Sequence, residues 1–95
     1  MDNVKPFHLF SEFLGTFMLQ AVYLVRHGDP LAMGFTLAAM AFFSGPISGA
    51  YLNPALTLSG LRTNTSTGAL IATVAAQVAG AMCADAYVRN YAFSS

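Results

Sequence analysis

Charged residues are scarce in this sequence and make up only 8% of its 95 positions. A soluble domain usually carries about 25% charged residues, and a small one needs a polar shell and a net charge well away from zero. Here four basic and four acidic residues cancel. The composition therefore excludes an ordinary soluble globule, a disordered tail and a basic nucleic-acid-binding protein, so we expect no nucleic-acid partner.

Cysteine is almost absent as well, since Cys83 stands alone. A single cysteine excludes a disulfide framework and a cysteine-built zinc site. His8 and His27 have no second ligand at metal spacing, and no general base accompanies the cysteine. We therefore expect no metal, no cofactor and no enzymatic activity.

Hydrophobic residues, by contrast, make up 56% of the chain. This composition predicts an integral, multi-pass membrane protein in contact with membrane lipid. A membrane helix needs about 20 mostly apolar residues, so 95 residues hold three spans or at most four. Three helices do not easily enclose a polar pathway, which predicts oligomerisation or a chain that is part of something longer.

Polar residues divide the chain into apolar stretches. We predict membrane-spanning helices over about 7–25, 31–48 and 68–88. A polar turn separates the first two, with Pro30 suited to the first turn of the second helix. The expected fold class is an all-α membrane protein that combines these three helices with one shorter, re-entrant half-helix.

The half-helix is predicted from the uncharged stretch over 31–61, which is too long for one span and too short for two. Glycine and proline interrupt it around Gly49, and non-helical backbone at membrane depth survives only where protein buries it or where it lines a wet cavity. Asn53 and Pro54 then supply an N-cap and a first-turn proline. A helix over about 53–60 is roughly 12 Å long, less than half of the roughly 30 Å hydrocarbon core. We expect it to enter and leave by one membrane face, with its positive dipole end inside the membrane.

Three motifs, in order along the chain, resemble the aquaporin and glycerol-facilitator family, also called the major intrinsic protein family. The segment 48–58, SGAYLNPALTL, is similar to the family signature. SEFLGTF over 11–17 resembles the family's first helix, and AQVAGA over 76–81 resembles its third. A single Asn-Pro-Ala tripeptide would be weak evidence, but three ordered motifs on a membrane composition are specific.

The resemblance covers one three-helix repeat, similar to the first of the two inverted repeats that family members carry in one chain. It implies a single aquaporin-like half-domain over residues 1–95. The family's second repeat places an arginine directly after its Asn-Pro-Ala, whereas Leu56 holds that position here. Tyr51 replaces a frequent histidine, and Met33 falls at a constriction position where aromatic residues are frequent. These departures predict a wider, less polar filter around Met33.

The resemblance also assigns a solute path. Asn53 would donate its amide hydrogens to a passing water or hydroxyl, while Pro54 and Ala55 would start the half-helix and let it pack end to end with a partner. The residues expected along the path are Asn53, Pro54, Ala55, Met33, Tyr51 and Leu56.

Structural support is expected from Glu12, Gln77, Gly49 and Gly80. In the family the glutamate equivalent to Glu12 accepts hydrogen bonds from the re-entrant loop, and the alternative is a residue that snorkels to the interface. We expect Gln77 to form hydrogen bonds within the bundle. Gly80 belongs to a stripe of small residues at 68, 72, 76, 80 and 84 that would let a helix approach closely.

The remaining charges allow two orientations. Lys5 and Arg62 lie on one side of the predicted membrane, and Arg26 and Arg89 on the other. Because orientation follows the Lys/Arg bias, an unbiased chain could insert both ways, and an antiparallel homodimer would reproduce an inverted-repeat plan. Four charges are also too few to show a bias, so pairing with a different aquaporin-like half stays open.

Asp85, which the resemblance does not explain, is expected to pair with Arg89 one turn away.

The sequence is therefore compatible with three functions. The first is passive conduction of water, extended to small neutral solutes such as glycerol, through a pore that a second half completes. The alternative is a truncated or accessory subunit that packs against a full-length relative without conducting. The third is a small antiparallel transporter that uses Glu12 or Asp85 as a proton site.

Overall fold

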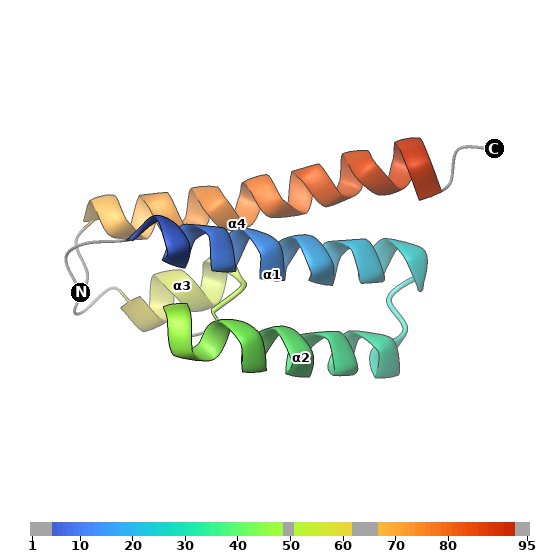
Figure 1. The fold of residues 1–95 in the computed structure, drawn as a ribbon, viewed down its shortest axis with the longest axis horizontal. Helices are drawn as coiled ribbons and strands as arrows, with labels where there is room; N and C mark the ends of the chain where they lie inside the picture. The colour runs from blue at the N-terminus through green and yellow to red at the C-terminus, as the bar shows by residue number, and fades with distance from the viewer. Residues whose placement is uncertain (1–4, 49–50, 62–66, 93–95) are drawn as a thin grey trace.

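The computed structural model describes residues 5–48, 51–61 and 67–92, and the regular elements in these ranges are all helical. In chain order they are α1 (Pro6–Val25), α2 (Pro30–Ser48), α3 (Pro54–Leu61), α4 (Thr67–Tyr87) and a short π-helix, η1 (Val88–Ala92) (Figure 1). Three segments are long and apolar enough to cross a membrane, namely Pro6–Val25, Pro30–Ile47 and Thr67–Tyr91. The predicted all-α chain with three membrane-length helices is thus confirmed.

Proline begins three of these helices, at Pro6, Pro30 and Pro54. The first turn of a helix has no intrahelical use for a backbone N–H, and the fixed φ of proline already suits a helix. The start of α2 is fixed further by Asp29, whose Oδ2 accepts a hydrogen bond of 2.8 Å from the N–H of Ala32. Local sequence therefore sets where these helices begin.

A tight turn reverses the chain between α1 and α2. His27 has a φ of 56° and Gly28 a φ of 73°, so two successive residues adopt the left-handed conformation. The Gly28 N–H donates a hydrogen bond of 2.9 Å to the Tyr23 carbonyl, which closes the end of α1. As a result α2 runs back alongside α1 in the opposite direction (Figure 1).

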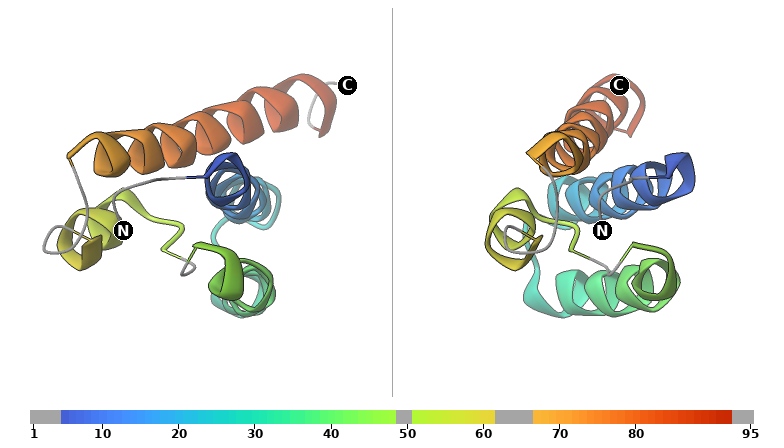
Figure 2. Two further views of the ribbon diagram at one scale, coloured as in Figure 1. Left: turned by 60° about the vertical axis from the view of Figure 1, so that its left-hand side comes forward. Right: turned by 90° about the vertical axis from the view of Figure 1, so that its left-hand side faces the viewer.

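Helix α1 is the central element of the bundle, with α4 on one side and α2 on the other (Figures 1 and 2). Among the described helices, α2 contacts only α1, and α3 contacts only α4. Helix α3 occupies the end of the bundle where α2 ends and α4 begins, and its own N-terminus faces the middle of the bundle (Figure 1). The arrangement leaves the space between α1 and α2 open toward the segment that precedes α3.

The interface between α1 and α4 is the closest packing in the fold. On α4 the buried residues are Ala69, Thr73, Gln77, Gly80 and Ala84. A side chain at Gly80 would collide with the carbonyl oxygen of Phe13 and would lie 3.2 Å from the Phe17 nitrogen. Glycine at this position therefore lets the two helix backbones touch.

The predicted small-residue stripe on α4 was wrong at its beginning. Gly68 is exposed and a side chain there would meet no other atom within 4 Å, whereas its neighbour Ala69 is buried. A strict four-residue repeat drifts by about 40° per step around a helix of 3.6 residues per turn. The buried stripe corrects the drift with one three-residue step, from Gln77 to Gly80.

The interior of the bundle is polar and its surface is apolar. The largest fully buried side chains are Gln77, Glu12, Val88, Thr57, Ser11 and Ser44. Large hydrophobic side chains lie outside instead, such as Phe42, which is 87% exposed, and only 6% of the α2 span is buried. An apolar surface of this extent requires lipid or a protein partner around it.

We predict that Gly80→Ala lowers the melting temperature in detergent, because the added methyl group must push α1 and α4 apart. Overpacking of this kind costs about 1–3 kcal/mol. Gly68→Ala is the matched control on the same helix, and it should leave the melting temperature unchanged or raise it slightly, since alanine favours a helix over glycine. Equal melting temperatures for the two variants would show that the close approach of α1 and α4 at Gly80 does not contribute to stability.

Candidate functional site

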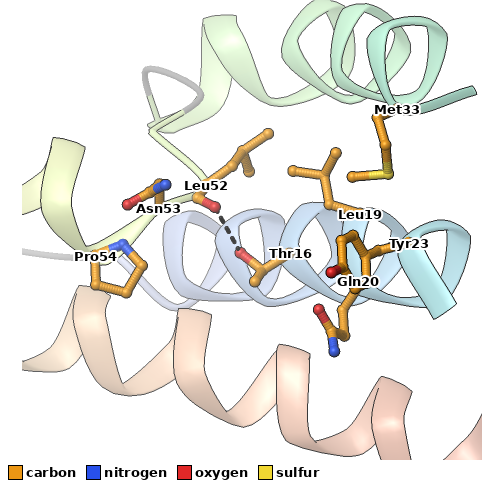
Figure 3. Close-up of a pocket in the computed structure, with 8 residues that line it drawn as sticks. All are labelled: Thr16, Leu19, Gln20, Tyr23, Met33, Leu52, Asn53 and Pro54. Carbon is orange, nitrogen blue, oxygen red and sulfur yellow. Dashed lines mark hydrogen bonds between the residues drawn. The ribbon is translucent and has the colours of Figure 1, made fainter. Parts of the chain in front are cut away.

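The site is built around Leu52, which precedes the first turn of α3. Its backbone N–H donates a hydrogen bond of 2.7 Å to Glu12 Oε1. Its carbonyl accepts a longer hydrogen bond of 3.4 Å from Thr16 Oγ1 (Figure 3). Glu12 and Thr16 are four residues apart and so share one face of α1. Both backbone polar groups of Leu52 are therefore held by side chains of the central helix.

Leu52 also has an unusual backbone conformation. Its φ of 55° lies in the left-handed region, and its side chain is only 3% exposed. This conformation costs a non-glycine residue of the order of 1–3 kcal/mol and persists only where the surroundings fix it. Gly15 makes room for it, because a side chain there would collide with the Leu52 side chain.

A buried hydrogen-bond network joins α1, α3 and α4. Gln77 Nε2 donates a hydrogen bond of 2.8 Å to Glu12 Oε1 and one of 2.6 Å to Thr57 Oγ1. The Thr57 hydroxyl in turn donates a hydrogen bond of 2.9 Å to the Asn53 carbonyl. None of Glu12, Thr57 and Gln77 is more than 1% exposed, so these bonds form in a low-dielectric interior where each is strengthened.

Gln77 keeps one polar atom unused. Its Oε1 is buried and accepts no hydrogen bond from a described residue, because both amide hydrogens are directed to Glu12 and Thr57. The amide is thereby oriented as a pure donor. Such an orientation suits a carboxylate neighbour, which can only accept when ionised.

Asn53 is the N-cap of α3. Its side-chain Oδ1 accepts a hydrogen bond of 2.7 Å from the Ala55 N–H, and Pro54 has no N–H to satisfy. With the oxygen used for the cap, the amide hydrogens of Asn53 are left without a partner among the described residues. The exposed side chain therefore presents two donors at the N-terminus of a helix.

These donors border a groove between α1 and α2, which we call the α1–α2 groove. It consists of two hollows of about 260 and 320 Å³ that share four lining residues, namely Leu19, Met33, Leu52 and Asn53. The first hollow is completed by Thr16, Gln20, Tyr23 and Pro54 (Figure 3), and the second by Gly34, Leu37 and Tyr51. The groove thus runs from the cap of α3 along α1 and α2.

The structure places the predicted path residues as follows. Asn53, Pro54, Met33 and Tyr51 line the α1–α2 groove, and Ala55 is exposed in the first turn of α3. Leu56 lies in α3, but its side chain is outside the described part, as is the whole of Gly49. Of the predicted supporting residues, Glu12 and Gln77 meet in the buried network, and Gly80 packs against α1.

Sequence reasoning missed Thr16 and Thr57 as members of the site. Each lies one helical turn after a residue that was singled out, Thr16 after Glu12 and Thr57 after Asn53. Residues at this spacing share a helix face, so a search for polar side chains one turn away could have found both. Among the described residues, no group of three or more histidine, cysteine, aspartate or glutamate side chains could hold a metal ion.

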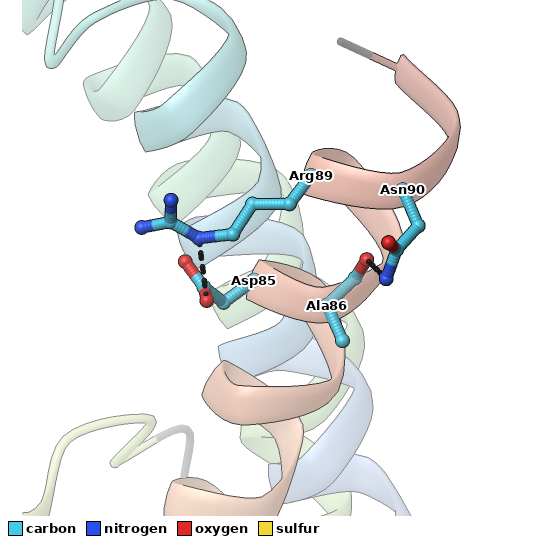
Figure 4. A network of polar contacts seen from close by, with 4 residues as sticks. All are labelled: Asp85, Ala86, Arg89 and Asn90. Carbon is cyan, nitrogen blue, oxygen red and sulfur yellow. Dashed lines mark hydrogen bonds and ion pairs between the residues drawn. The ribbon is translucent and has the colours of Figure 1, made fainter. Parts of the chain in front are cut away.

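Asp85 and Arg89 form a separate polar pair on α4 and η1. Arg89 Nε donates a hydrogen bond of 2.8 Å to Asp85 Oδ2, and Asn90 Nδ2 donates one of 2.7 Å to the Ala86 carbonyl (Figure 4). The predicted pairing one turn apart is thus confirmed. The Asp85 side chain is 37% exposed and that of Arg89 is 68% exposed, so solvent screens the pair and it adds little to stability.

Comparisons with known proteins show which family this chain resembles. A family model described as "Major intrinsic protein" matches residues 27–95. A curated relative from Lactiplantibacillus plantarum, "Glycerol uptake facilitator protein-like 6", is 39% identical over 92 residues, which cover 85% of this chain and 42% of the relative. The chain therefore spans less than half of the length of that relative. No solved structure matches the chain.

The network predicts that Thr57→Val destabilises the fold by about 1–3 kcal/mol, because it leaves a buried Gln77 amide hydrogen without its acceptor and removes the hydroxyl bond to the Asn53 carbonyl. The unfolding free energy, followed by SDS titration in mixed micelles, measures this loss. Thr36→Val is the matched control, since the Thr36 hydroxyl bonds only to the Ala32 carbonyl of its own helix. It should change stability by less than about 0.5 kcal/mol, and a similar loss in both variants would argue against a special role of Thr57.

Proposed function

Because this chain belongs to the major intrinsic protein family, we propose that it forms one half of a passive transmembrane channel for water and small neutral solutes such as glycerol. Family membership and three membrane-length helices make it an integral, multi-pass membrane protein. The printed name of the curated relative supports glycerol as a solute.

The observation that carries the proposal is the depth at which α3 begins. Leu52 is bonded to Thr16, which lies at the middle of α1, and Thr57 is bonded to Gln77, which lies at the middle of α4. With α1 and α4 crossing the bilayer, the N-terminus of α3 then sits close to the midplane. The eight residues of α3 extend over only about 12 Å, and the helix returns to the end where α4 begins (Figure 1). We infer that α3 is a re-entrant half-helix.

A half-helix in this position presents the right groups for passive conduction. The amide hydrogens of Asn53 replace hydrogen bonds that water or a hydroxyl group gives up in the pore. The positive end of the α3 dipole repels cations, and the uncharged side chains that line the groove, such as Leu19 and Met33, do not replace the hydration shell of an ion. No covalent step is involved.

The selectivity of the proposed pore follows from the residues beside Asn53. Leu56 occupies the position after Ala55, and Met33 lines the groove from α2. Neither side chain carries a charge, so this half contributes no charged constriction at these positions. We propose a wider, less polar filter, which favours neutral solutes larger than water.

A second half is needed to close the pore, because the described residues of one chain provide a groove and not a tube. We propose a second copy in the opposite orientation or a different half of the same family. The two-against-two distribution of Lys5 and Arg62, and of Arg26 and Arg89, permits the antiparallel homodimer. The alternative function is a truncated or accessory half that packs against a full-length relative and does not conduct alone.

Asn53→Asp should reduce water and glycerol flux into proteoliposomes by about tenfold, the factor that corresponds to 1.4 kcal/mol. Aspartate caps a helix as well as asparagine does but has no amide hydrogens to donate, so conduction should fall, and the melting temperature of the variant in detergent separates this loss from any cost of the added carboxylate to folding. Stopped-flow light scattering on liposomes that hold only this chain measures the flux. Asn90→Asp, at the exposed end of the chain's last helix, is the matched control and should conduct like the wild type. Unchanged flux in Asn53→Asp would falsify the role given to Asn53.

The orientation of the chain can be tested in a Cys83→Ser background with a single cysteine at Asn3 or at Ser95. An antiparallel homodimer predicts that a membrane-impermeant maleimide labels each cysteine to about half from outside, with the rest accessible only after permeabilisation. Labelling from one side only would remove the antiparallel homodimer and leave pairing with a different half.

A further inference from the structure

We infer that Gln20 and Tyr23 contact the solute and set the glycerol-to-water selectivity in the part of the α1–α2 groove that α3 does not reach. This inference rests on the proposed function and adds to it two specificity-determining residues on α1. Neither residue belongs to the motifs that relate the chain to its family. The argument depends on their place on the helix, on the walls of the groove and on their lack of partners.

Four polar residues of α1 form one stripe along the helix. At 100° per residue, Glu12, Thr16, Gln20 and Tyr23 fall within an arc of about 80°. The first two hold the backbone of Leu52. The other two continue the same stripe for about 10 Å beyond Thr16, toward the end of α1 that is remote from α3. This face of α1 therefore holds the segment at Leu52 in one half of the bundle. In the other half its polar side chains, Gln20 and Tyr23, hold no such segment.

Beside this half of the stripe, α2 contributes apolar residues to the groove. Gln20 and Tyr23 line the hollow that Asn53 and Met33 also line (Figure 3). The neighbouring hollow continues along Gly34 and Leu37 of α2. Gln20 and Tyr23 are thus polar groups on the α1 side of a groove whose α2 side is apolar.

Both side chains lack a hydrogen-bond partner among the described residues, in contrast to Glu12 and Thr16. Gln20 also borders a hollow beside Asp85 between α1 and α4, but no hydrogen bond joins the two side chains. An unpartnered polar group is expensive in a membrane unless it faces a wet cavity. Water or solute in the groove therefore explains the unpartnered amide of Gln20, and it would also satisfy the hydroxyl of Tyr23, which is 52% exposed near the end of α1, where tyrosine suits the membrane interface as well.

The chemistry of the two residues fits a small polyol better than it fits water alone. An amide and a phenol both donate and accept hydrogen bonds, and the two positions are about 4.5 Å apart along the helix axis. A solute with hydroxyl groups along one edge can bond to both at once while its C–H edge contacts Met33 and Leu37. A water molecule can bridge the two positions as well, but it can replace a lost bond with one to a neighbouring water, so its passage depends less on them.

The test is the ratio of glycerol flux to water flux in proteoliposomes. Gln20→Leu and Tyr23→Phe should each reduce glycerol flux by about fivefold, the effect of losing one hydrogen bond, and should change water flux by less than twofold. Tyr91→Phe, a matched control whose side chain is 74% exposed and lies outside the groove, should keep the wild-type ratio. If Gln20→Leu and Tyr23→Phe keep the wild-type ratio of glycerol flux to water flux, the inference is overturned while the proposed function stands. A wild-type protein that conducts neither solute would overturn the proposed function and this inference with it.

Cysteine accessibility provides a second measurement that does not depend on selectivity. In the Cys83→Ser background, Gln20→Cys and Tyr23→Cys should react with a charged methanethiosulfonate, and the reaction should block flux. Met18→Cys is the control, because Met18 lies on another face of α1, about 120–160° away from the stripe. Equal reaction at all three positions, or none at Gln20→Cys and Tyr23→Cys, would show that the stripe does not face an aqueous path.

Discussion

The Glu12 carboxylate is the contact on which the rest of the arrangement depends. A carboxylate inside a membrane protein is costly unless it is paired, and here one oxygen receives hydrogen bonds from the Leu52 backbone and from Gln77. These bonds tie α1 to α4 and to the segment before α3. They hold Leu52 in a conformation that it would not adopt alone, and Leu52 in turn positions the Asn53 cap.

The sequence was informative wherever a property is decided locally. Few charges and long apolar stretches were sufficient to predict three membrane-length helices, because the bilayer imposes the length of a span. Pro30 and Pro54 mark helix starts because proline needs no N–H partner there. The three ordered motifs indicated the family, which the comparison over residues 27–95 establishes independently.

The features that escaped prediction depend on contacts between distant segments. The left-handed Leu52 could not be foreseen, since leucine has no local preference for that conformation and is held there by Glu12, Thr16 and Gly15. The buried register of α4 depends on where α1 touches it, so a regular repeat of small residues misplaced the stripe by one position at Gly68. The pairing of Asp85 with Arg89, by contrast, needs one helix only.

Among the described helices, α2 touches α1 alone, and the left-handed pair His27 and Gly28 joins the two. Its other end, at Ser48, is only four residues from Leu52, so the hydrogen bond from Leu52 to Glu12 also limits where α2 can end. The side chains that α2 contributes to the α1–α2 groove, Met33 and Leu37, are apolar. Substitutions at these two positions can therefore reshape one wall of the groove while the tether of α3 stays intact.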